Sequence, residues 1–202
     1  MAFRLQDDTL PAGDDGRNAQ IRRWQRQLLQ GAPPERPTAA TELTKLGAEE
    51  ELLECVKSGD DLTRRLATHG LWECWLNERG PAARKEIERG IKKMEQGNLE
   101  SALETFGKLV KKYPDWAEAQ NKQATVLYLL GNPRLSYQVC QVVVELKPSH
   151  FGAWNGLALC AARMERWRDA LRAARQALAL QPGAQSNLDL IQLAESKLRE
   201  EA

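Results

Sequence analysis

The sequence is poor in the residues from which reactive centres are usually built. It has only two histidines, His69 and His150, and no Cys-x-x-Cys pair. Because structural zinc sites use short paired spacings, neither a metal site nor a cofactor is expected. The four cysteines are predicted to be reduced and mostly buried, which favours a reducing compartment; they are Cys55, Cys74, Cys140 and Cys160.

An excess of one charge and long apolar runs are missing as well. The chain has 29 Lys+Arg and 28 Asp+Glu, a net charge of +1, whereas nucleic-acid-binding proteins normally carry a clear basic excess. No apolar run approaches the ~20 residues of a membrane helix, and the first residues do not read as a secretory signal. We therefore expect a soluble protein in the cytoplasm or inside a plastid or mitochondrion, with no nucleic-acid partner and no transmembrane segment.

Enzyme motifs are also missing from the sequence. There is no glycine-rich phosphate loop, no G-x-S-x-G and no H-E-x-x-H, so the sequence predicts no catalytic residues and a protein that is not an enzyme.

Residues 1–40 are expected to be a largely disordered tail, because prolines and glycines interrupt them. Within this tail, residues 18–30 have the pattern of a short basic amphipathic helix, with Ile21, Trp24 and Leu28 on one face. Such a helix either docks on a partner or an anionic surface, folds back on the main domain, or stays disordered.

Residues 41–80 are expected to form a pair of helices that acts as an N-terminal cap or a degenerate repeat. The leucine spacing predicts one helix from Thr41 to about Ser58. Asp60 or Asp61 can cap a second helix that ends at Gly80.

The remainder of the chain contains an internal repeat, in which equivalent positions recur every 34 residues. Small residues recur where two helices must approach closely, and a proline closes each unit because it cannot continue a helix. The recurring positions are Pro114/Pro148/Pro182, Ala102/Ser136/Ala170, Phe106/Cys140/Ala174, Leu109/Val143/Ala177, Gly90/Ala124/Ala158 and Gly97/Gly131.

The 34-residue period of these positions resembles the tetratricopeptide repeat (TPR) family, in a form similar to its bacterial and organellar branch. The resemblance implies an all-α, right-handed solenoid of helical hairpins, with repeats at 83–114, 117–148 and 151–182 and a C-terminal capping helix at 184–201. The sequence departs from the family pattern at four points. Lys93 stands where an aromatic is usual and Gln120 replaces a tryptophan, while Pro133 follows Gly131 at the turn of the second repeat and Glu165 replaces the turn glycine of the third.

In the family, the first helices of successive repeats line a concave groove that binds a peptide or a helix. Carried over by repeat position, the lining here is Ile87, Ile91, Asn121, Thr125, Tyr128, Asn155, Leu159 and Arg163. Asn121 and Asn155 occupy the same position of two successive repeats. Their amides either hold the backbone of an extended peptide or only tie adjacent helices together.

Some members of the family bind acidic chaperone C-termini through lysine, asparagine and arginine side chains. Ile87, Ile91, Gly152 and Gly156 occupy those positions here, so this carboxylate clamp is not expected. The expected function is a protein-interaction adaptor or assembly factor. The alternative is a permanent structural subunit of a larger complex.

Overall fold

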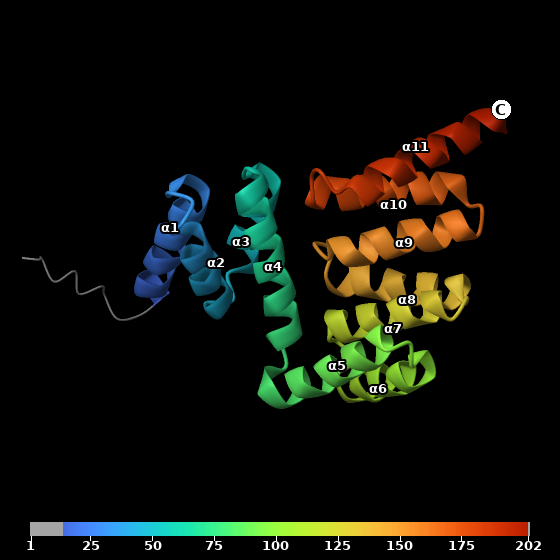
Figure 1. Cartoon of the computed structure of the whole chain (residues 1–202), viewed down its shortest axis with the longest axis horizontal. Helices are drawn as coiled ribbons and strands as arrows, with labels where there is room; N and C mark the ends of the chain where they lie inside the picture. Colours follow the sequence, from blue (N-terminus) through green and yellow to red (C-terminus); the bar gives the residue numbers. More distant parts are fainter. Residues whose placement is uncertain (1–13, 202) are drawn as a thin grey trace, which may run out of the picture. The chain divides into compact units, whose positions relative to one another are not determined.

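The computed structural model describes residues 14–201, with the side chain of Asp14 excepted. Over these residues the chain forms eleven α-helices and no strands (Figure 1). The expectation of an all-α protein is therefore confirmed. The described chain divides into two compact units, one ending at Leu71 and one beginning at Trp72, and each is described by itself below.

The first unit contains α1 (Asp14–Gln30), α2 (Arg36–Lys45), α3 (Glu49–Ser58) and the start of α4 (Asp61–Asn77). Helix α1 packs on α2 and α3 and buries Ile21 and Leu28, while Arg22 and Arg23 stay exposed. The expectation of a largely disordered tail is therefore wrong for residues 14–40. The predicted amphipathic helix is present, begins earlier than expected and folds back on its own unit. Residues 1–13 of the predicted tail lie outside the described residues.

The single helix predicted from Thr41 to Ser58 is in fact two helices. Gly47 has a φ of +62°, the left-handed region in which glycine carries no steric penalty. The Ala48 N–H donates to the Leu43 carbonyl and the Gly47 N–H donates to the Thr44 carbonyl, both at 3.0 Å. This is the Schellman pattern that ends a helix.

Helix α4 begins as the sequence predicts, because Asp60 Oδ1 accepts a hydrogen bond from the Thr63 N–H at 2.9 Å. Its end was wrongly placed: α4 ends at Asn77, and Gly80 opens the next helix, with Pro81 in its first turn. Proline is well tolerated there because the first-turn N–H groups have no partner within the helix.

The second unit is a stack of helix pairs, drawn from green to red in Figure 1. Each helix from α5 to α10 packs on the next one along the chain. The pairs are α5 (Gly80–Glu95) with α6 (Leu99–Lys112), α7 (Ala117–Leu129) with α8 (Pro133–Leu146), and α9 (Phe151–Arg163) with α10 (Trp167–Leu180), followed by α11 (Gln185–Glu200). The predicted helical hairpins and final helix are all present.

Close approach of the paired helices explains the small residues of the repeat. A Cβ atom added to Gly90 on α5 would lie 2.5 Å from Cε1 of the Phe106 ring on α6. Glycine at this position therefore lets the buried Phe106 ring fill the space between the two helices.

The turn inside each pair has the same geometry, whatever residue occupies it. Gly97, Gly131 and Glu165 all have positive φ, and the value for Glu165 is 57°. The Glu165 N–H donates to the Ala162 carbonyl, and the Arg166 N–H donates to the Ala161 carbonyl. The frame of the repeat thus forces a left-handed conformation on a residue that has a Cβ atom, which costs on the order of 1 kcal/mol.

No helix within residues 14–201 is both long and apolar enough to cross a membrane.

Candidate functional site

The first helices of successive repeats touch one another and so form a continuous surface. Helix α5 contacts α7, α7 contacts α9, and α9 contacts α11. Of the eight side chains predicted to line a groove on these helices, Ile87 and Asn121 are buried, and Ile91, Tyr128, Asn155 and Leu159 are half-buried. Thr125 and Arg163 are exposed.

The two asparagines are engaged inside the protein. Asn155 Nδ2 donates to Asn187 Oδ1 at 2.6 Å, which ties α9 to α11. Asn121 Nδ2 donates to Glu118 Oε2 at 3.2 Å within α7. The accessible part of the predicted lining therefore consists of Ile91 on α5, Thr125 and Tyr128 on α7, and Leu159 and Arg163 on α9.

A buried polar cluster lies where α7 and α9 begin. Glu118 and His150 are both fully buried, and His150 Nε2 lies 3.0 Å from Glu118 Oε2. His150 Nδ1 accepts a hydrogen bond from the Ala153 N–H at 3.1 Å and so caps α9. Because Nδ1 is an acceptor, the ring proton is on Nε2, and a neutral imidazole donates to the Glu118 carboxylate.

The charge of Glu118 is compensated locally. Burial alone would raise the pKa of this carboxyl group, but the His150 hydrogen bond and the nearby Lys122 ammonium outweigh it and hold the pKa below its usual value. Lys122 Nζ lies 3.0 Å from Glu118 Oε1 and 5.0 Å from the centroid of the Trp72 ring. The cluster therefore joins a buried ion pair to a cation–π contact.

Residues Trp72–Asn77 of α4 supply the aromatic side of this cluster. The Trp75 ring stacks on the His150 ring with 4.3 Å between centroids. The Trp75 carbonyl accepts a hydrogen bond from Trp116 Nε1 at 2.8 Å. Trp116 and His150 stand immediately before α7 and α9, at the same position of two successive repeats, so one tryptophan contacts both of these equivalent residues.

Nothing in the sequence pattern connected His150 to Glu118 or Lys122. The structure places His150 as the N-cap of α9 and buries it completely. The signal that could have revealed the cluster is its equivalence with Trp116 in the repeat. Gln120 and Trp154 are also equivalent in the repeat, and they make the same hydrogen bond although they differ in type. Gln120 Nε2 donates to the Pro114 carbonyl at 2.5 Å, and Trp154 Nε1 donates to the Pro148 carbonyl at 2.8 Å.

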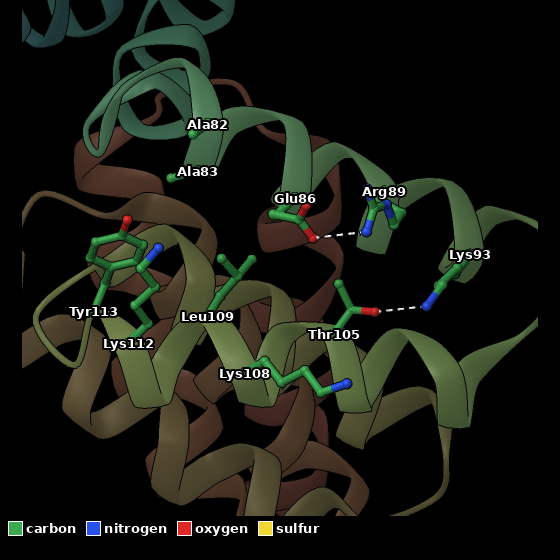
Figure 2. A pocket seen from close by; sticks show the side chains of 10 residues that line it. All are labelled: Ala82, Ala83, Glu86, Arg89, Lys93, Thr105, Lys108, Leu109, Lys112 and Tyr113. Carbon is green, nitrogen blue, oxygen red and sulfur yellow. Dashed lines mark hydrogen bonds and ion pairs between the residues drawn. The ribbon is translucent and has the colours of Figure 1, made fainter.

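A second feature is an open cavity of about 450 Å³ between α5 and α6 (Figure 2). Ala83 and Leu109 form an apolar floor, with Ala82 and Tyr113 beside them. Glu86, Arg89, Lys93, Thr105, Lys108 and Lys112 complete the lining. Figure 2 shows the Glu86–Arg89 ion pair and the hydrogen bond from Lys93 to Thr105, which are 3.1 and 2.9 Å long.

A third feature is an apolar stripe on α8. Leu135, Val142 and Leu146 are 52%, 41% and 42% exposed. They follow one another at i, i+7 and i+11, with half-buried Val139 between the first two, so they lie on one face of the helix.

The thiols and the acidic side chains offer little chemistry within the described residues. All four cysteines are buried and none forms a disulfide, and burial raises the pKa of Cys55 and of Cys140 to about 12. Over residues 14–201 no three His, Cys, Asp or Glu side chains gather as metal ligands.

Comparisons with known proteins match the repeat region. The family model described as "Anaphase-promoting complex, cyclosome, subunit 3" matches residues 95–177. A TPR repeat-containing protein of Rhizobium etli is 34% identical over 67 residues, which is 33% of this chain and 33% of that protein. The human FK506-binding protein-like is 29% identical over 119 residues, or 55% of this chain and 34% of that protein. The matched regions thus span about a third of each relative.

Solved structures show the same fold at low identity. The first TPR of Spaghetti (RPAP3), bound to the HSP90 peptide SRMEEVD, has a TM-score of 0.56 at 18% identity and covers 56% of this chain and 90% of that one. The Sgt2 TPR domain from Aspergillus fumigatus gives 0.57 at 15%, covering 60% and 82%. The P58(IPK) TPR domain gives 0.54 at 15%, covering 92% and 56%. The period of the sequence, the three helix pairs and these likenesses agree that the chain has the fold of tetratricopeptide-repeat proteins.

Proposed function

We propose that the chain is a protein-interaction scaffold, an adaptor or assembly factor without catalytic activity, which holds a segment of a partner on its first helices. The observation that carries the proposal is the continuous contact of α5, α7, α9 and α11. That surface presents side chains of mixed chemistry from two successive repeats: the Thr125 hydroxyl, the Tyr128 phenol, the Leu159 side chain and the Arg163 guanidinium. Such a surface can bind both the backbone and the side chains of a peptide or helix.

The partner that this surface takes differs, we propose, from an acidic chaperone C-terminus. The structural relative RPAP3 was solved with the HSP90 peptide SRMEEVD. Here, Ile87 is fully buried and Ile91 packs against the same core. Neither can offer a cation to a carboxylate, which supports the absence of a clamp. The net charge of +1 likewise supports a protein partner over nucleic acid.

Exposed positions provide the test, because substitutions there leave the core intact. The variant Thr125→Arg/Arg163→Glu alters the proposed surface on α7 and α9. The matched control Gln138→Arg/Arg168→Glu makes the same two changes of charge, neutral to positive and positive to negative, at exposed positions on α8 and α10. Each tagged protein is purified from its native source, and co-purifying proteins are quantified by mass spectrometry. We expect the first variant to lose its main partner and the control to retain it. Equal recovery by both variants, with unchanged helical circular dichroism, would contradict the proposal.

A second function, a permanent structural subunit of a larger complex, is favoured by the apolar stripe on α8. Apolar side chains aligned on one exposed helix face are typical of protein contacts. If this function is correct, the protein elutes from gel filtration in a stoichiometric complex that persists in high salt. The change Leu135→Glu/Val142→Glu then releases a monomer, whereas Thr125→Arg/Arg163→Glu does not. The compartment of the partner found in either experiment identifies that of the chain.

A further inference from the structure

The first repeat departs from the third at positions that pack the helices of the third repeat together. Two repeats before Trp154, Leu157 and Ala161 of α9, the same positions on α5 carry Glu86, Arg89 and Lys93. Leu157 and Ala161 are buried in the core of the third repeat, and Trp154 packs against it. In the first repeat the three equivalent side chains are charged and line an open cavity. Charged side chains thus line the cavity at positions where the third repeat has packed apolar ones.

Positive charge dominates this cavity. Its lining contains four cations and one carboxylate, and that carboxylate, Glu86, pairs with Arg89. Lys108 pairs with Glu104 outside the lining. Within residues 14–201, neither Lys93 nor Lys112 forms an ion pair.

Lys93 has the strongest requirement for an anion. Its side chain is half-buried, and the partners of its ammonium group are the Thr105 hydroxyl at 2.9 Å and the Ser101 carbonyl at 3.4 Å, both neutral. The Glu104 carboxylate attracts Lys93 electrostatically but forms its ion pair with Lys108, so this partly desolvated cation still gains free energy when another carboxylate binds it directly. The opposite end of the cavity is lined by Lys112 and Tyr113, where Lys112 Nζ lies 5.1 Å from the Tyr113 ring centroid.

We propose that the α5–α6 cavity is a second docking site, which binds an extended acidic segment of a partner protein. Its carboxylates meet Lys93 and Lys112, and an apolar side chain between them rests on the floor of Ala83 and Leu109. The α5 lining runs from Ala82 to Lys93, a length of about 16 Å at 1.5 Å per residue. That length accommodates roughly five residues of an extended chain, and the cavity volume is within the ordinary range of ligand pockets.

Two observations favour an acidic peptide over a nucleic acid. The net charge of the chain is only +1, whereas nucleic-acid-binding proteins carry a clear basic excess. The cavity also has an apolar floor, which a phosphate backbone does not use. This site is separate from the α7–α9 surface, so the proposal does not depend on the function proposed above.

The test uses the full chain and a fluorescent hexapeptide, Glu-Glu-Leu-Glu-Glu-Leu, acetylated and amidated at its ends so that no free C-terminus contributes. Fluorescence anisotropy measures its affinity. We expect binding that weakens as NaCl rises from about 50 to 200 mM and that falls about tenfold in Lys93→Met, which removes one charge-assisted hydrogen bond. Amide NMR shift changes should centre on α5 and α6.

The matched control is Lys111→Met, which removes an exposed cation from the same turn of α6 as Lys112 but outside the cavity lining. Because both variants lose one positive charge, an equal loss of affinity in both would show only a general electrostatic attraction and overturn the proposal. No binding at about 1 mM peptide would overturn it too and leave a solvated repeat face. Tighter binding of a single-stranded oligonucleotide at the same residues would show that the cavity binds nucleic acid and would overturn the proposal of an acidic peptide. Retained affinity in a folded Lys93→Met protein would show that Lys93 does not bind the peptide and would overturn the proposal.

Discussion

Replacing His150 with alanine removes several interactions at once. The variant loses the cap to the Ala153 N–H, the hydrogen bond to Glu118 and the stacking contact with Trp75. A lost cap costs roughly 1 kcal/mol, a lost hydrogen bond to a buried carboxylate about 2 kcal/mol, and a lost aromatic contact about 1 kcal/mol. We therefore expect His150→Ala to lower the free energy of unfolding by about 4 kcal/mol, which for a unit of this size lowers Tm by roughly 10–15 °C.

The variant His150→Asn separates these contributions, because asparagine also caps helices through its side-chain oxygen. It should recover about 1 kcal/mol relative to alanine. Urea titrations followed by circular dichroism and by tryptophan fluorescence measure both variants, and Trp75 beside residue 150 makes the fluorescence a local probe. If His150→Ala unfolds within about 1 kcal/mol of the wild type, or if asparagine is no better than alanine, the cluster contributes less than its contacts suggest.

The pH dependence of stability follows from Glu118 in the same cluster. Its folded-state pKa lies below its usual value of 4.5, so the unfolded chain binds the proton more readily and acid favours unfolding. The stabilisation is complete at pH values well above 4.5 and is lost as pH falls through the lowered pKa. Glu118→Gln should destabilise the protein at neutral pH and flatten this acid limb. An unchanged acid limb would mean that other carboxyl groups control it.

Four other substitutions or reactions test the packing. Gly90→Ala should destabilise by about 2 kcal/mol through its clash with Phe106, whereas Gly107→Ala, whose added Cβ meets nothing closer than 3.8 Å, should gain about 0.5–1 kcal/mol of helix propensity; thermal melts compare them. Glu165→Gly should stabilise by about 1 kcal/mol by relieving its positive φ, and no gain in a urea titration would argue against strain there. The Cys140 thiol should react with a thiol reagent only at the rate of unfolding, because it is buried with a raised pKa; rapid native labelling would contradict this.

The sequence was sufficient for the repeats and insufficient for what lies outside them. A regular period identifies helix pairs because it constrains many positions at once. By contrast, Pro33 and Pro34 suggested a disordered tail although they lie in the connection between α1 and α2, and Pro37 is in the first turn of α2. The break at Gly47 was missed because leucines on both sides keep a helical spacing.

The buried cluster was harder to predict because its partners come from distant segments. His150 and Trp116 share a repeat position but not a chemistry, so pattern matching gave no reason to compare them. Their common partner, Trp75, lies on a helix that precedes the first predicted repeat. The cavity at α5–α6 was only half visible: Lys93 was noticed as a departure from the family, but its surroundings required the structure.

The position of Trp75 also affects how the protein opens in its native state. In a solenoid where each repeat touches only its neighbours, opening begins at an end and proceeds repeat by repeat. The Trp75 carbonyl accepts the hydrogen bond of the Trp116 indole and the Trp75 ring stacks on His150, so both corners depend on the same residue of α4. Amide hydrogens near the starts of α7 and α9 should therefore exchange together as one cooperative block, more slowly than those of α11. Replacing Trp75 with leucine keeps the carbonyl that binds Trp116 but removes the stacking on His150, so the start of α9 should then exchange faster than the start of α7.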